Sequence, residues 1–322
     1  MFLEEIRKKG FPEKNAAILK EFYKDYQKAT GKTDTELYSW FSTFSDLLQE
    51  QILNPYSFEP FHKAIRDPFD YWQFGQDFVK PLIAEGSSII GEHVLQIIET
   101  ALAKKENVVL LSNHQTEIDP QVMGCLLEKT HPSIIEKLIF IAGQKVITDP
   151  FAIPFSMGCN LLCIYSRRYI DIDLTTKTHK QEHNTHTMRQ MGALLREGGK
   201  CIYVAPSGGR DRRNAEGKLQ VASFDPDSVE MFRLMSLKSG NPCHFIPFAL
   251  MTYDMLPPPE TVDLHIGEKR PLQKSRVHLY FGPECSLTTL GGESSSKHER
   301  RTNIAMAIWE QVAAQYHYLE KL

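Results

Sequence analysis

The sequence lacks a paired-cysteine motif, an apolar run of membrane-spanning length and an excess of positive charge. Its six cysteines form no CxxC pair, which favours reduced core thiols in a reducing compartment. No apolar stretch approaches the roughly 18 to 20 residues that cross a bilayer. A net charge of -3 gives no global reason to expect nucleic acid. We therefore expect a soluble protein with no nucleic-acid partner and at most peripheral membrane contact.

Targeting signals and internal repeats are also missing. The opening residues carry Glu4 and Glu5 and show no signal-peptide pattern, so the expected location is the cytoplasm. A length of 322 residues with 42% hydrophobic and 24% charged residues is ordinary for a globular enzyme-sized chain. Composition alone excludes little more.

Residues 1–78 show helical periodicity. Apolar side chains recur at helical spacing along two stripes, which are Leu19, Phe22, Tyr23 and Tyr26, then Leu37, Phe41, Phe44, Leu48 and Ile52. Thr33 and Glu36 have the spacing of a capping box before the second stripe. Pro55, Pro60 and Pro68 then interrupt the pattern. We predict a small N-terminal helical bundle domain over 1–78.

Residues 79–322 alternate between helical stripes and short apolar runs. The predicted strands are Val108–Leu111, Lys137–Val146, Leu161–Tyr165, Cys201–Ala205, Phe245–Leu250 and Val277–Phe281. A helix ending at Gly198-Gly199 separates the third strand from the fourth, and a helix through Ile304 and Leu319 closes the chain. This alternation predicts an α/β domain with a mixed, mostly parallel sheet flanked by helices.

The octapeptide Asn-His-Gln-Thr-Glu-Ile-Asp-Pro at residues 113–120 carries the clearest chemical signal. It follows an apolar run and holds His114 and Asp119 five positions apart. A turn at a strand end can present His114 as a general base while the Asp119 carboxylate holds its other ring nitrogen. The nucleophile would then be a substrate hydroxyl.

Two other interpretations of the octapeptide stay open. Asp119 before Pro120 also suits the start of a helix, with the aspartate as N-cap. A metal site could use His114, Glu117 and Asp119, but no second His/Cys cluster at ligand spacing supports it. We therefore expect neither a metal nor another cofactor.

An anion site is predicted after the strand at 201–205. The segment Pro-Ser-Gly-Gly-Arg-Asp-Arg-Arg at 206–213 combines two glycines, which let the backbone approach a ligand, with Arg210 and Arg212, which suit phosphate. Arg167 and Arg168 follow another strand. The alternative is a solvated basic loop neutralised by Asp211.

The wording NHQTEIDP, the segment PSGGRDR at 206–212 and His244-Phe245-Ile246-Pro247 together resemble the glycerolipid acyltransferase superfamily with its NHxxxxD motif, and within it the soluble plastid-type glycerol-3-phosphate acyltransferases. The likeness covers most of the chain. It implies transfer of a fatty acyl group from acyl carrier protein, with acyl coenzyme A as the other donor, to the sn-1 hydroxyl of glycerol 3-phosphate.

The resemblance also implies roles for individual residues. His114 would be the base, Asp119 its partner, and Arg168, Arg210 and Arg212 the phosphate ligands, with Arg167 and Tyr169 as further candidates. Tyr169 departs from the family pattern, which has histidine there, and a phenol cannot supply the charge of an imidazolium. A processed plant-type chain would work in the plastid stroma.

Three rival functions remain open from the sequence. They are a 1-acylglycerol-3-phosphate acyltransferase acting at the sn-2 hydroxyl, a non-catalytic acyl-chain or phospholipid-binding protein in which His114 is structural, and a metal-dependent hydrolase. Turnover that depends on His114 and survives a chelator separates the transferase from the last two.

Overall fold

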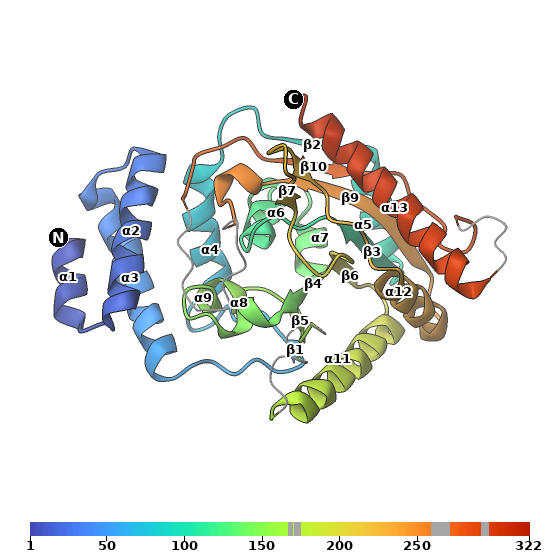
Figure 1. Cartoon of the computed structure of the whole chain (residues 1–322), viewed down its shortest axis with the longest axis horizontal. Helices are drawn as coiled ribbons and strands as arrows, with labels where there is room; N and C mark the ends of the chain where they lie inside the picture. Colours follow the sequence, from blue (N-terminus) through green and yellow to red (C-terminus); the bar gives the residue numbers. More distant parts are fainter. Residues whose placement is uncertain (167–169, 171–174, 259–270, 291–295) are drawn as a thin grey trace.

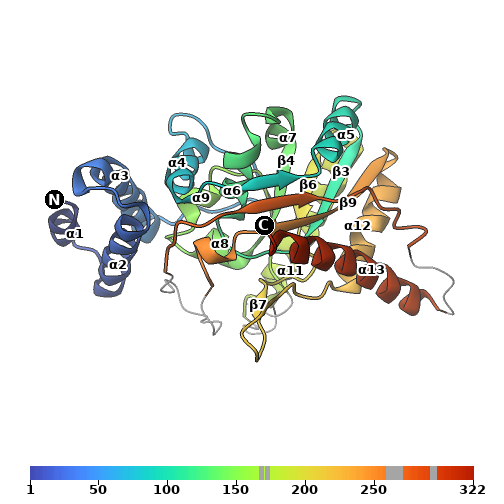
Figure 2. The ribbon, with the colours of Figure 1, turned by 90° about the horizontal axis from the view of Figure 1, so that it is seen from above.

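The computed structural model describes residues 1–166, 170, 175–258, 271–290 and 296–322. Its helices surround one large sheet, and the first three helices stand to one side (Figure 1). Figure 2 shows the sheet edge-on between two helical layers. The architecture confirms the predicted α/β class with a mixed, mostly parallel sheet.

The N-terminal helices pack together through aromatic side chains. They are α1 (Phe2–Lys9), α2 (Glu13–Thr30) and α3 (Asp34–Leu53). Thr33 and Glu36 form the predicted capping box at the start of α3, which typically stabilises a helix by about 0.5–2 kcal/mol. The same cluster includes Phe74 and Phe78 of α4 (Tyr71–Val79), so the helical unit is joined to the rest of the chain by buried apolar surface. The domain boundary after residue 78 stays a prediction.

The main sheet has eight strands in the order β1-β5-β4-β6-β3-β9-β10-β2. Their bounds are β1 (Phe61–His62), β2 (Ser88–Ile90), β3 (Asn107–Ser112), β4 (Leu138–Gly143), β5 (Leu161–Ile164), β6 (Cys201–Val204), β9 (Cys243–Met251) and β10 (His278–Phe281). Strands β5, β4, β6, β3 and β9 are mutually parallel, while β1 and β10 run antiparallel to their neighbours β5 and β9. The carboxyl ends of the five parallel strands therefore share one edge.

Helices cover both faces of this sheet (Figure 2). One face carries α5 (Glu92–Ala103), α6 (Asp119–Leu127) and α7 (Pro132–Lys137), and the other carries α11 (Lys177–Glu197), α12 (Pro226–Ser239) and α13 (Lys297–Leu319). The smaller elements are η1 (Lys80–Leu82), α8 (Gln144–Thr148), α9 (Ile153–Ser156), β7 (Arg212–Arg213), β8 (Leu219–Gln220) and η2 (Tyr253–Met255). The strand β3 is buried along its whole length because helices lie on both sides.

Two differences from the sequence prediction concern strands. The strand expected at 137–146 ends at Gly143, since the chain turns there into α8. The short strands β1 and β2 were not predicted, because two or three residues carry no periodicity. As predicted, all six cysteines are free, and they lie in buried or half-buried positions. Burial raises the pKa of Cys159 to about 12, which is typical of an unreactive core thiol.

Gly158 is the point at which the start of α4 approaches the turn after α9. A Cβ built on Gly158 would lie 2.6 Å from the backbone nitrogen of Trp72. We expect Gly158→Ala to lower the free energy of unfolding by about 1–3 kcal/mol, because backbone atoms must shift to make room. Denaturant unfolding measures this.

Gly143→Ala is the matched control for this prediction. The same added Cβ meets nothing within 4 Å at Gly143, where φ is -79. Its effect should stay within about 0.5 kcal/mol, as for an ordinary surface change. Equal unfolding midpoints for the two variants would contradict the close approach of α4 to Gly158.

Candidate active site

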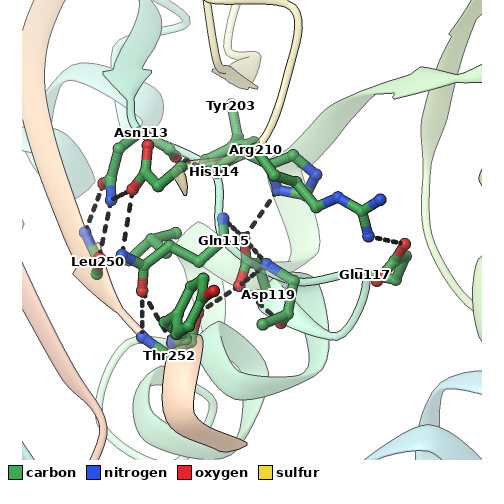
Figure 3. A network of polar contacts seen from close by, with 12 residues as sticks. Asn113, His114, Gln115, Glu117, Asp119, Tyr203, Arg210, Leu250 and Thr252 are labelled. Carbon is green, nitrogen blue, oxygen red and sulfur yellow. Dashed lines mark hydrogen bonds and ion pairs between the residues drawn. The ribbon is translucent and has the colours of Figure 1, made fainter. Parts of the chain in front are cut away.

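The site is built on the loop between β3 and α6. Strand β3 ends at Ser112 and α6 begins at Asp119, so residues 113–118 lie at the carboxyl edge of the parallel strands. Open α/β sheets bind ligands at this edge. The loops that follow β6 and β9 begin at the same edge and contact the first loop through Asp211 and Thr252 (Figure 3).

His114 and Asp119 form the predicted pair. His114 Nδ1 lies 2.8 Å from Asp119 Oδ2, and the two side chains are 29% and 1% exposed. With the carboxylate ionised, Nδ1 donates its hydrogen and the lone pair of the neutral imidazole is on Nε2. No group in the described ranges forms a hydrogen bond with that nitrogen. The buried carboxylate therefore fixes Nδ1 of His114, and Nε2 is left to accept a proton.

The Asp119 carboxylate is saturated with donors. It accepts the backbone N–H of Gln115 at 3.0 Å, the N–H and hydroxyl of Thr116 at 3.2 and 2.9 Å, and the hydroxyl of Thr252 at 2.6 Å. Burial acts to raise the pKa of Asp119, but the bonds from His114, Thr252 and Gln115 outweigh it and lower the pKa below its ordinary value. Asp119 is thus a charged anchor at neutral pH.

The helix-cap interpretation of Asp119 is wrong in detail. Asp119 and Pro120 are the first residues of α6, and Ile118 occupies the N-cap position without a side-chain bond. The carboxylate turns back into the loop and bonds to residues that precede the helix. It orders the histidine loop instead of capping α6.

Asn113 ties the loop to both neighbouring strands. Its amide nitrogen donates to Asp211 at 2.7 Å and to the carbonyl of Leu250 at 2.9 Å, and its amide oxygen accepts from Leu250 N–H at 2.9 Å. The Tyr203 hydroxyl donates to the Asn113 carbonyl at 2.7 Å. The residue before the histidine is therefore fixed from β6 and β9.

Gln115 and Asp211 complete this fixation. Gln115 donates to Asp211 at 3.1 Å and accepts the N–H groups of Thr252 and Tyr253 at 2.7 and 2.8 Å. Asp211 donates its own N–H to the carbonyl of His114 at 2.8 Å. Burial raises the pKa of Asp211 to about 6, with bonds from Asn113, the Ala222 backbone and Gln115 acting against it. Asp211 is therefore a buried residue that fixes the histidine loop, and not the counter-ion of a solvated basic loop.

The predicted arginines are partly described. Arg210 Nη1 lies 2.5 Å from Glu117 Oε1, which links the two sequence motifs directly. Arg212 is half-buried at the start of β7. Arg167, Arg168 and Tyr169 lie outside the described residues. The structure thus brings Arg210 to the histidine loop.

An apolar cavity adjoins the same loop. It holds about 910 Å³ of empty space, its open mouth included. Its walls come mainly from α2, α3, α4, α8, α9 and the histidine loop. The apolar lining residues are Ile18, Phe22, Phe44, Phe78, Ile118, Val146, Phe151, Ala152, Phe155 and Leu256, and the polar and charged ones are Glu21, Asp25, Glu117, Lys145, Asp149 and Ser156. The N-terminal helices therefore line a space that ends beside the site.

Two kinds of feature are absent from the described part of the chain. It contains no group of three His, Cys, Asp or Glu side chains arranged to hold a metal ion. None of its helices has the length and apolar character needed to cross a bilayer.

The sequence identified some residues of the site and missed others. The spacing in the octapeptide identified His114 and Asp119, whereas Gln115, Tyr203 and Thr252 were missed. The position of Gln115 directly after His114 in the octapeptide was the signal that could have identified it. Nothing in the sequence marks Thr252, which is 133 positions from its partner Asp119.

Comparisons with known proteins agree with the motif resemblance. The family model described as Acyltransferase matches residues 93–251. A chloroplastic glycerol-3-phosphate acyltransferase of Cucurbita moschata is 40% identical over 317 residues, which cover 96% of this chain and 71% of the relative. Its counterpart in Arabidopsis thaliana is 37% identical over 96% of this chain and 69% of the relative, and that in Pisum sativum is 35% identical over 98% and 71%.

Proposed function

Because the chain belongs to the family of plastid-type glycerol-3-phosphate acyltransferases, we propose that it moves a fatty acyl group from a thioester donor to the sn-1 hydroxyl of glycerol 3-phosphate. The donor is acyl carrier protein, with acyl coenzyme A as the alternative. The products are lysophosphatidic acid and the free thiol of the carrier.

The observation that carries the proposal is the orientation of the histidine. Asp119 holds Nδ1 of His114, and Nε2 is left to accept the proton of the substrate hydroxyl. The alkoxide attacks the thioester carbonyl, and the tetrahedral intermediate collapses with loss of the thiolate. The imidazolium returns its proton to that sulfur, so the histidine ends the cycle neutral. No covalent acyl-enzyme is needed.

The phosphate of the substrate is assigned to the arginines of the loop after β6. Arg210 is paired with Glu117 of the histidine loop, so its guanidinium lies at the same edge of the sheet as His114. Arg212 is the second ligand in this proposal, and Arg167, Arg168 and Tyr169 are its remaining members. A guanidinium fork suits a phosphate dianion through paired, charge-assisted bonds.

The acyl chain is assigned to the apolar cavity. Phenylalanine rings from α2, α3, α4 and α9 pack against one another along its floor, with Phe22 and Phe78 centroids 5.4 Å apart and Phe78 and Phe155 also 5.4 Å apart. Glu117 and Ile118 of the histidine loop are part of its lining. A chain entering it would begin near the base that activates the hydroxyl.

The proposal is tested by product formation. Purified protein with labelled glycerol 3-phosphate and palmitoyl or oleoyl carrier protein should yield labelled lysophosphatidic acid, and a parallel series with acyl coenzyme A identifies the donor. Activity should persist with a chelator present. Binding of both substrates without product from either donor would overturn the transferase in favour of a binding protein.

Narrowing the cavity should change the preference for chain length. We expect Ala152→Phe to reduce kcat/KM for a palmitoyl donor about tenfold or more while a lauroyl donor is affected far less, since each methylene that loses its pocket costs about 1–3 kcal/mol. Ala17→Phe is the control, because Ala17 is exposed on α2 beside the lining residue Ile18. An equal loss for both donors would remove the cavity from the acyl site.

A further inference from the structure

Glu117 and Arg210 form the least exposed arginine–carboxylate pair at the site. The two side chains are 13% and 10% exposed, and they join the histidine loop to the loop after β6. Figure 3 shows Arg210 reaching from the loop beside His114 to Glu117. The next residue, Asp211, donates its N–H to the carbonyl of His114 at 2.8 Å. The base and the arginine are thus held in one cross-linked unit.

Through this contact, Glu117 has two opposite effects on phosphate binding. Its negative charge repels a phosphate dianion and competes for the guanidinium. Its oxygen also fixes Nη1 of Arg210, and because the guanidinium is planar, fixing one nitrogen orients every N–H of the fork. The first effect weakens substrate binding, and the second strengthens it. The sign of the net effect is measurable.

We propose that Glu117 is a positioning residue that holds the Arg210 guanidinium where the phosphate of glycerol 3-phosphate docks, so that the substrate hydroxyl is presented to His114. This inference rests on the proposed function.

Orientation should outweigh repulsion for three reasons. A free arginine side chain carries about 2 kcal/mol of rotamer entropy, which a phosphate would otherwise have to remove on binding. The pair is largely shielded from water, so the attraction between its charges is little screened by solvent and salt. The hydroxyl and the phosphate of the substrate are linked by a short carbon chain, so misplacing one misplaces the other relative to His114.

The test is steady-state kinetics of Glu117→Gln, which keeps the shape of the side chain and removes its charge. We expect the KM for glycerol 3-phosphate to rise about tenfold, because its phosphate loses an oriented guanidinium, and kcat to fall by a smaller factor, because the linked hydroxyl is displaced from His114. The KM for the acyl donor should not change. Glu117→Asp, which keeps the charge, should recover part of the loss.

Two controls separate positioning from a general structural effect. Asp254→Asn removes the partner of Arg213, which belongs to the hairpin that follows Arg210, and that pair is exposed by 51% and 69% at 3.6 Å. This variant should match wild type. In an Arg210→Ala background, Glu117→Gln should add no further change in KM, because the guanidinium that Glu117 positions is gone.

Failure of the positioning role and failure of the proposed function give different results. A lower KM in Glu117→Gln would make Glu117 a competitor of the substrate, and an unchanged KM would make it a structural residue; either result overturns positioning. A rise in KM for both substrates together with a lower unfolding midpoint would overturn it as well. Absence of glycerol 3-phosphate acylation by the wild type would instead defeat the proposed function itself.

Discussion

Replacing His114 with alanine is expected to reduce turnover of glycerol 3-phosphate by about 10²- to 10⁴-fold, the usual contribution of a positioned general base. Within the described part of the site, His114 is the proton acceptor that a buried carboxylate orients. Asp119 holds its Nδ1, and Nε2 is left for the substrate. Initial rates at saturating acyl donor measure the loss. Binding of glycerol 3-phosphate should persist, because the arginines remain.

The fold should tolerate the loss of His114. The side chain is 29% exposed, and the contacts that fix its loop come from its backbone carbonyl and from Asn113 and Gln115. His186→Ala, at an exposed position on α11, is the matched control and should retain full activity. If the two variants turn over equally, a residue other than His114 is the base.

Changing Asp119 to asparagine should have an effect of similar size by a different route. An amide cannot accept all the hydrogens that now converge on the carboxylate, and its NH₂ group would face Nδ1 of His114, favouring the wrong tautomer. The corresponding change in the serine protease triad lowers kcat about 10⁴-fold, and we expect a loss of about 10³- to 10⁴-fold here. Asp254→Asn, exposed by 69%, should leave the rate unchanged.

The same substitution should alter stability in a pH-dependent manner. The folded state lowers the pKa of Asp119, so its contribution to stability is present above the unfolded pKa of about 4 and is lost as pH falls through the folded value. The difference in unfolding free energy between wild type and Asp119→Asn should therefore be largest near pH 7 and shrink below about pH 4. A difference that grows on acidification would contradict an ionised Asp119.

Features encoded within a few residues were predictable. The capping box of Thr33 and Glu36 and the His114–Asp119 pair depend on spacings of three and five residues, and both are present in the structure. The apolar run Val108–Leu111 that forms the middle of β3 was equally clear, since a strand buried on both faces favours an unbroken apolar sequence. Local sequence carries such features because the interacting groups share one turn or one strand.

Features that depend on distant residues were not predictable. Asp211 is an acidic residue flanked by arginines, so its neighbours in sequence suggested a surface ion pair. It becomes a buried acceptor only because Asn113 and Gln115 approach it from the loop after β3. Thr252 has an ordinary hydroxyl until β9 brings it to Asp119. Strands as short as β1 and β2 form because a neighbour supplies their hydrogen bonds, not because their residues demand it.

The fixation of the histidine loop has a consequence for how the chain folds. Asn113 bonds to Leu250 across 137 positions, Asp119 to Thr252 across 133 and Gln115 to Asp211 across 96. Each of these contacts closes a long loop, and the entropy of closure must be spent before the contact can stabilise anything. The histidine and aspartate can meet early, since they are five positions apart. We expect their rigid alignment to come late in folding, after β6 and β9 have both paired with β3.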